Sequence, residues 1–346
     1  MKKNTVNRAQ NYRVLAAQFY EQGNYEKSIQ FLEKSICMDS EDPIAHFMMG
    51  NIMEDLGKIS EAISAYKKTV KIDPNFAEAY YNLGILMDRR GYSNKAIEIY
   101  KKAIEKNPQI AGAYYGIAII LDDKGEKHEA LNYYNKTIEY DPTYDRAYFY
   151  IANLYDEWGD KETALKYYNK VTELVPEDYI AFNNIASILE ELRRYEEAIA
   201  AIQKSIDING RYYRSHFNKG VILDKLGRKQ EALWSYDRAI ELYPYCLEAY
   251  HNKGVILLEL KDLNNAISAF SQAIRLNSRH EASYYNRACC YALKGNAKEA
   301  IKDLQVAISL NPRNIEYAKK CSDFDLIREK SEFKGIIQSG TKDNIN

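Results

Sequence analysis

Residues 77–110 read AEAYYNLGILMDRRGYSNKAIEIYKKAIEKNPQI, and the pattern of this stretch recurs every 34 residues along the chain. The eighth position of the repeat is small in all nine copies and is glycine at Gly84 in this one. The residues at this position are Ala16, Gly50, Gly84, Ala118, Ala152, Ala186, Gly220, Gly254 and Ala288. A fixed period of this length is the signature of a solenoid, in which each unit buries its apolar face against its neighbours.

Nine units of 34 residues cover residues 9–314 without insertion or deletion. Position 15 is glycine in seven of them, as at Gly91, and the exceptions are Arg193 and Lys261. Glycine at this position supplies the left-handed backbone conformation that ends a helix. Position 32 is proline in six units, as at Pro108, and proline also ends a helix. The pattern therefore predicts two helices of about a dozen residues per unit, separated by a glycine turn and followed by a proline turn.

Helical spacing identifies the buried positions of each unit. Positions 4, 7, 8 and 11 of the first helix share one face, and position 20 of the second helix is alanine in eight units. Position 24 is aromatic in six units, as at Tyr100, and a ring there fills the space beside the small residues. The sixth unit departs most from this pattern, with Ile202 at position 24 and Gly210 at position 32.

The 34-residue period and the residue types that recur at these positions resemble the tetratricopeptide repeat (TPR) family. The resemblance implies an all-α solenoid of tandem antiparallel helix pairs, stacked in a right-handed superhelix whose first helices line a concave groove. We expect a flexible N-terminus over residues 1–8 and one solenoid domain over residues 9–314. Capping helices should then cover the last repeat over residues 315–338, and residues 339–346 should form a disordered tail.

The bulk composition disfavours several kinds of partner. Lys plus Arg total 48 against 49 Asp plus Glu, so the net charge of -1 provides no basic field for nucleic acid. No apolar stretch reaches the length of about 18 residues that spans a membrane, and no signal peptide is apparent, so we expect a cytoplasmic chain without a membrane partner. The five cysteines are scattered and form no Cys-x-x-Cys, so we expect packing residues, with no metal and no cofactor.

Binding residues are expected on the face of the first helices that lies opposite the buried one, at positions 2, 5, 6, 9, 12 and 13. We call this surface the ladder face. Position 6 is asparagine in five units, and a carboxamide offers both a donor and an acceptor to a peptide main chain. The alternative is that these side chains only solvate the helix or bond the neighbouring loop. This asparagine row comprises Asn82, Asn184, Asn218, Asn252 and Asn286.

Two further rows lie on the ladder face. Aromatic residues at position 5 suit a recognition groove, although contact with the adjacent first helix is an equal alternative. Acidic residues at position 12 occupy the last turn of the helix, where the helix dipole disfavours negative charge, which suggests basic ligand side chains. The aromatic row comprises Tyr81, Tyr115, Phe149, Phe217 and Tyr285. The acidic row comprises Asp88, Asp122, Asp156, Glu190 and Asp224.

No nucleotide-binding, metalloprotease or hydrolase motif occurs in the sequence, so we expect no enzyme. The function predicted is a protein interaction scaffold that binds an extended, preferably basic peptide segment in its concave groove. The alternative is a structural or self-assembly module that acts through its ends or its convex face. The partner is expected to be a protein or peptide, and the chain itself a monomer or a weakly self-associating species.

Overall fold

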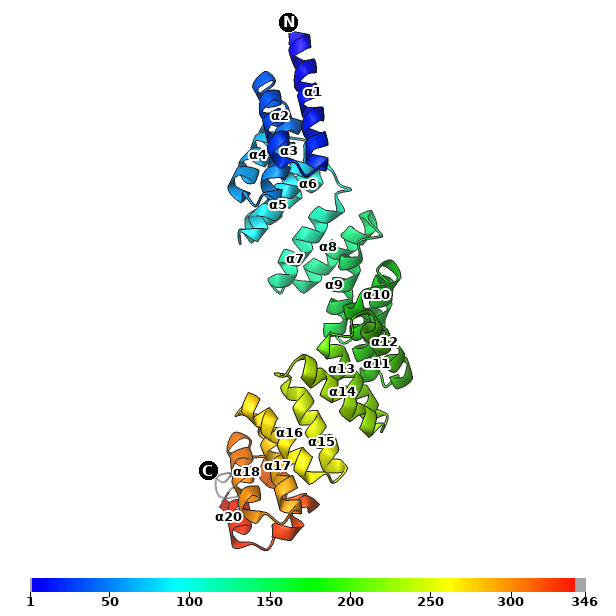
Figure 1. Ribbon diagram of the computed structural model, residues 1–346, viewed down its shortest axis with the longest axis vertical. Coiled ribbons are helices and arrows are strands. Elements are labelled where there is room, and N and C mark those ends of the chain that lie inside the picture. The colour runs from blue at the N-terminus through cyan, green and yellow to red at the C-terminus, as the bar shows by residue number, and fades with distance from the viewer. Residues whose placement is uncertain (1, 340–346) are drawn as a thin grey trace. The chain divides into compact units, whose positions relative to one another are not determined.

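The computed structural model describes residues 2–339, and this range contains helices and no strand (Figure 1). The predicted all-α architecture of helix pairs is therefore confirmed. Contacts group the chain into two compact units, residues 1–174 and residues 175–346, whereas the sequence predicted one solenoid domain over residues 9–314. Each unit is a stack of helix pairs and is described by itself.

The first unit contains five helix pairs. The two helices of a pair contact each other, and within the unit α2, α4, α6 and α8 also contact the first helix of the next pair. The pairs are α1 (Lys2–Glu21) with α2 (Tyr25–Met38), α3 (Pro43–Asp55) with α4 (Ile59–Ile72), α5 (Ala77–Arg89) with α6 (Ser93–Lys106), α7 (Ala111–Asp123) with α8 (Lys127–Tyr140), and α9 (Asp145–Glu157) with α10 (Lys161–Leu174).

The second unit contains four helix pairs and a C-terminal segment. Its first helices also contact one another, α11 with α13, α13 with α15, and α15 with α17, so they form a continuous layer. The pairs are α11 (Tyr179–Glu191) with α12 (Tyr195–Ile208), α13 (Tyr213–Lys225) with α14 (Lys229–Leu242), α15 (Leu247–Glu259) with α16 (Leu263–Leu276), and α17 (Glu281–Leu293) with α18 (Ala297–Leu310). The C-terminal segment consists of α19 (Asn314–Lys320), the 3-10 helix η1 (Ser322–Ile327) and α20 (Ser331–Ser339).

Helix α1 begins at Lys2, although residues 1–8 were expected to be flexible. No glycine precedes Gly23 and no proline precedes Pro43, so nothing in the sequence ends the helix early. Ala9 is buried, and its carbonyl oxygen accepts a hydrogen bond from the Ser35 hydroxyl of α2 at 2.8 Å. The N-terminal residues therefore extend the first helix of the first pair. Residue 1 lies outside the described range.

The turn within each helix pair has the left-handed backbone that the glycines predicted. Gly91 has a φ of 79°. The two exceptions adopt the same conformation, because Arg193 has a φ of 59° and Lys261 a φ of 62°. The turn geometry is thus common to all these units, and the two larger residues adopt it with the strain that a Cβ atom causes there.

The core of a helix pair depends on close contact between the small residue at position 8 and the ring at position 24. A Cβ atom added to Gly84 of α5 would lie 2.5 Å from the Tyr100 ring of α6. At the equivalent place in the second unit, a Cβ atom on Gly254 would lie 2.7 Å from the Phe270 ring. The predicted packing of rings against small residues is confirmed, and the rings are buried in both units.

The C-terminal segment covers the last helix pair. Phe324, Ile327 and Phe333 are buried and belong to one apolar cluster with residues of α17 and α18. The Phe324 ring lies 5.8 Å from that of Tyr285 on α17 and 5.6 Å from that of Phe333. The apolar end of the last repeat is thereby removed from water. Helix α20 ends at Ser339, and residues 340–346, which were expected to be disordered, lie outside the described range.

A histidine cluster links α15 and α17 in the second unit. His251 Nδ1 lies 3.0 Å from the Ser283 hydroxyl, which is also 2.7 Å from His280 Nδ1. The His251 ring packs 5.7 Å from Phe270 and 4.9 Å from His280, measured between ring centroids. Burial, with a smaller effect of the nearby His280, lowers the pKa of His251 to about 4. His251 is therefore a neutral packing residue at pH 7.

The left-handed turns generate a stability prediction. Replacing Arg193 by glycine removes the Cβ strain from a residue whose φ is 59°, so we expect Arg193→Gly to raise the free energy of unfolding by about 1 kcal/mol. The matched reverse change, Gly227→Arg, should lower it by a similar amount, because Gly227 has a φ of 73° and open space around its Cα atom. Urea denaturation measures both, and a less stable Arg193→Gly variant would contradict this interpretation.

The histidine cluster generates a pH prediction. Because the pKa of histidine in an unfolded chain is about 6.5, His251 binds a proton more readily after unfolding. Its contribution to stability is complete above about pH 6.5 and is lost as the pH falls toward 4. Since the ring keeps some solvent contact, we expect wild type to lose about 2 kcal/mol more than His251→Gln between pH 7 and pH 4.5, measured by urea denaturation. The exposed His128→Gln control should match wild type, and an equal loss in His251→Gln would refute the assignment.

Candidate functional site

The asparagine row of the first unit consists of Asn82 on α5, and this side chain is engaged within the protein. Asn82 Nδ2 donates to Asn51 Oδ1 on α3 and to the Tyr66 hydroxyl on α4, both at 3.2 Å. The Tyr66 hydroxyl in turn donates to Asn51 Oδ1 at 2.8 Å. The carboxamide therefore joins two neighbouring helix pairs, through helices rather than through the neighbouring loop.

Two asparagines of the second-unit row, Asn218 and Asn252, each donate one hydrogen bond within the protein. Asn218 Nδ2 donates to Asn183 Oδ1 on the preceding first helix at 3.0 Å, and Asn183 Nδ2 donates to Asn184 Oδ1 at 3.3 Å. Asn252 Nδ2 donates to the Tyr236 hydroxyl at 3.5 Å. Asn82 and Asn252 donate to a tyrosine hydroxyl at position 24 of the preceding unit. The sixth unit has isoleucine at this position, and Asn218 donates to Asn183 instead.

Three asparagines of this row, unlike Asn184, have an acceptor oxygen that receives no hydrogen bond from the described residues. Among the described residues, nothing donates to the Oδ1 atoms of Asn218 and Asn252, and the Asn286 side chain makes no hydrogen bond. All three side chains are half-buried on the layer of first helices. The donor bonds fix the orientation of the Asn218 and Asn252 carboxamides, and each Oδ1 atom keeps its capacity to accept a hydrogen bond.

The aromatic row is half-buried and packs against the core. Each ring contacts another ring: Tyr81 with Tyr100, Tyr115 with Tyr134, Phe149 with Tyr168, Phe217 with Tyr236, and Tyr285 with Phe324. Burial raises the pKa of Tyr81, Tyr115 and Tyr285. The Tyr81 hydroxyl also lies over Gly112 of α7, where a Cβ atom would be 2.6 Å away. These rings therefore contribute to helix packing, and one edge of each remains on the ladder face.

The acidic row of the first unit is compensated by neighbouring side chains. Asp156 forms an ion pair with Lys161 at 2.7 Å. Asp122 accepts a hydrogen bond from the Tyr134 hydroxyl at 3.3 Å, and burial raises the pKa of Asp122. Asp88 accepts one from the Ser93 hydroxyl at 3.2 Å.

The acidic row of the second unit lacks such partners. Within the part of the chain that the structure describes, neither the side chain of Glu190 on α11 nor that of Asp224 on α13 makes a hydrogen bond or an ion pair. Both are half-buried and lie on the same layer of helices as the second-unit asparagine row. The structure thus brings uncompensated carboxylates and unpaired carboxamide oxygens together on the ladder face of the second unit.

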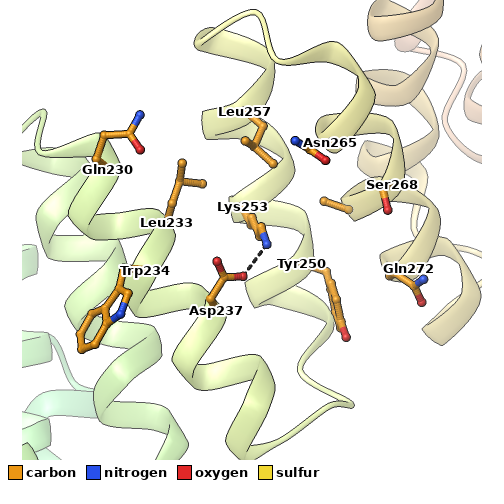
Figure 2. Close-up of a pocket in the computed structure, with 11 residues that line it drawn as sticks. Gln230, Leu233, Trp234, Asp237, Tyr250, Lys253, Leu257, Asn265, Ser268 and Gln272 are labelled. Atoms are coloured by element: carbon orange, nitrogen blue, oxygen red, sulfur yellow. Dashed lines mark hydrogen bonds and ion pairs between the residues drawn. The ribbon is translucent and has the colours of Figure 1, made fainter.

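A cavity of about 500 Å³ lies among α14, α15 and α16 (Figure 2). Trp234, which is 62% exposed, lines it beside the ion pair between Asp237 and Lys253. Gln272 also lines it, and its buried Oε1 atom has no hydrogen-bond partner. Sequence reasoning missed this cavity, and the available signal was a tryptophan at a position on the second helix that the repeat does not bury.

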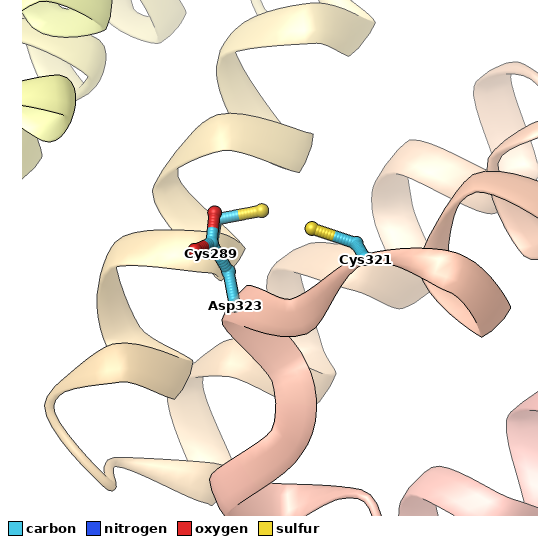
Figure 3. A group of neighbouring side chains, drawn as sticks. All are labelled: Cys289, Cys321 and Asp323. Carbon is cyan, nitrogen blue, oxygen red and sulfur yellow. The ribbon is translucent and has the colours of Figure 1, made fainter.

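Two cysteines that are far apart in sequence lie close together at the C-terminal segment of the second unit. Cys289 is buried on α17, Cys321 precedes η1, and Asp323 lies within η1. Their two sulfur atoms and a carboxylate oxygen all lie within 4.8 Å of one another (Figure 3). The expectation that the cysteines are only packing residues did not include this cluster.

Among residues 2–339, no helix is long and apolar enough to cross a membrane.

Comparisons with known proteins identify the repeats. Models described as TPR repeat or tetratricopeptide repeat match residues 50–91, 77–110, 111–144, 133–166, 151–212, 213–246, 247–280 and 282–314. Four of these matches share the bounds of the 34-residue units. A search of curated proteins gives no match.

Solved structures similar to the chain include YrrB, described as a TPR protein with an unusual peptide-binding site, at 27% identity. That match covers 54% of this chain and 98% of YrrB, with a TM-score of 0.47. Pseudomonas aeruginosa pilF is 20% identical over 60% of this chain and 94% of its own, with a TM-score of 0.52. A chain of the Cut9–Hcn1 hetero-tetramer of the APC/C is 14% identical over 96% of this chain and 76% of its own, with a TM-score of 0.51. The last two similarities bear on the fold, and the repeat matches show that the chain belongs to the tetratricopeptide repeat family.

Proposed function

We propose that the chain is a non-catalytic scaffold that binds an extended, basic segment of a partner protein on the ladder face of its second unit. The observation that carries this proposal is the combination of two kinds of unpaired acceptor on one layer of helices. These are the carboxamide oxygens of Asn218, Asn252 and Asn286 and the carboxylates of Glu190 and Asp224.

The asparagine row recognises the peptide main chain in this proposal. Packed helices are about 10 Å apart, and an extended chain advances about 3.3 Å per residue, so successive asparagines meet roughly every third ligand residue. Each Oδ1 atom accepts a hydrogen bond from a ligand N–H group. A single bond of this kind contributes only about 1 kcal/mol, so affinity comes from the row as a whole.

The acidic row supplies the preference for basic side chains. Glu190 and Asp224 lie near the C-terminal ends of their helices, where the helix dipole makes a carboxylate unfavourable. Unlike Asp156 of the first unit, they form no ion pair with any residue that the structure describes. A ligand lysine or arginine removes this unfavourable charge and gains a charge-assisted hydrogen bond.

The first unit is given a smaller part in binding. Its acidic residues Asp88, Asp122 and Asp156 already have partners, and Asn82 bonds two of its neighbours. We therefore propose that these residues, with the rings of Tyr81, Tyr115 and Phe149, bind a ligand more weakly than the ladder face of the second unit does. Phe217 and Tyr285 provide the aromatic edges within the second unit.

Selection from a random peptide library displayed on phage, with the full chain as target, tests the proposal. We expect selected peptides to be rich in lysine and arginine, because the exposed acceptors are anionic. Fluorescence anisotropy with one such peptide should show the double change Glu190→Gln, Asp224→Asn weakening binding about tenfold or more. The Asn286→Ala change should weaken it about fivefold. These side chains have no partner in the described chain, so thermal unfolding should hardly change.

Two control variants locate the binding surface. Glu196→Gln removes an exposed charge from the second helix α12 and should leave peptide affinity unchanged. Trp234→Ala tests the alternative that the partner binds at the 500 Å³ cavity, since this exposed ring lines it. Loss of binding in Trp234→Ala, with full binding in the acidic double variant, would replace the ladder face by the cavity as the interaction surface.

A further inference from the structure

The cluster of Cys289, Cys321 and Asp323 has the donor set of a metal site. It is built from two segments that lie 32 residues apart in sequence, the last repeat helix α17 and the start of η1. Cys321 and Asp323 are separated by one residue, so the start of η1 supplies two donors, and α17 supplies the third (Figure 3).

We propose that these three residues bind Zn²⁺ through two thiolates and one carboxylate, with the fourth position open to water or a ligand. Zinc–sulfur bonds of about 2.3 Å and zinc–oxygen bonds of about 2.0 Å place tetrahedral donors about 3.5 to 3.8 Å apart. The three donor atoms lie within 4.8 Å of one another, so small side-chain rotations bring them to a common ion. Soft thiolates select a thiophilic ion over Mg²⁺ or Ca²⁺.

The charges of the cluster favour a cation over an isolated thiol pair. Two sulfur atoms and a carboxylate oxygen converge here, and a divalent cation is bound by all three of these donors. The cation nearest to Asp323 is Lys261, whose Nζ atom lies 3.9 Å from Oδ1 and whose side chain is 65% exposed. An ion bound between the three donors neutralises the cluster directly and satisfies all three ligands at once.

Two of the three residues in the cluster are partly exposed to solvent. Cys289 is buried against the core, while Cys321 and Asp323 are half-buried, so an ion reaches the sulfur of Cys289 past the start of η1. Binding would tie η1 to α17 next to Phe324 and Ile327, the residues that cover the last repeat. Zinc should therefore stabilise the C-terminal segment, because it binds the folded cluster more tightly than the unfolded chain.

Cobalt titration of the reduced, metal-free full chain tests the site. Co²⁺ should bind at one equivalent with a thiolate-to-cobalt charge-transfer band, and Zn²⁺ should remove the band by displacement. We expect the band to be lost in Cys321→Ser and in Cys289→Ser, and Asp323→Asn to bind about tenfold or more weakly. Cys37→Ser, which changes an exposed cysteine outside the cluster, should behave as wild type.

A second readout separates ligation from folding. Zinc should raise the thermal unfolding temperature of wild type and of Cys37→Ser but not of Cys321→Ser. Cys321 is half-buried, so its serine variant keeps the test valid even if the buried Cys289→Ser fails to fold. Absence of a charge-transfer band, or an unchanged band in Cys321→Ser, overturns the proposal. The proposal is also overturned if the reduced chain binds no ion, and a small-molecule disulfide merely oxidises Cys289 and Cys321 to a disulfide while being reduced to two thiols.

Discussion

The contact between a small residue at position 8 and a ring at position 24 sets the distance between the two helices of a pair. At Gly84, any added carbon would lie 2.5 Å from the Tyr100 ring, so helix and ring are already in contact. Several of these rings carry hydroxyl groups that reach the ladder face, where Tyr66 bonds Asn51 and Asn82, and Tyr236 accepts from Asn252. Residues that fill the core thus also orient the polar side chains above it.

The two units differ in how far their polar rows are already paired. In the first unit, Asp156 has Lys161 and Asp122 has a tyrosine hydroxyl. In the second unit, the side chains of Glu190 and Asp224 have no such partner among the described residues, and Asn218 and Asn252 are bonded only through their Nδ2 donors. A regular fold therefore presents an unevenly satisfied surface, and the proposed binding site lies where the acceptors are unpaired.

Regular features were predictable from the sequence because they repeat. The period, the helix pairs and the turns follow from local rules on small residues, glycine and proline, and even Arg193 adopts the backbone that glycine predicts at its position. For the candidate site, the repeat indicated which positions belong to the ladder face, but it did not indicate which side chains there bond one another. That Asn218 bonds Asn183 depends on Ile202 replacing a tyrosine, and the meeting of Cys289 with Cys321 depends on how the C-terminal segment folds back onto α17. Such contacts join distant residues and leave no periodic signal.

The central claim is that the asparagine row recognises a peptide main chain, and backbone N-methylation of a selected peptide tests it most directly. N-methylation at one residue at a time removes a single N–H donor and keeps the side chain. The account predicts that affinity falls by about fivefold or more at roughly every third residue and little between, as the spacing of the helices requires. Equal affinity for all methylated peptides would contradict main-chain recognition by Asn218, Asn252 and Asn286.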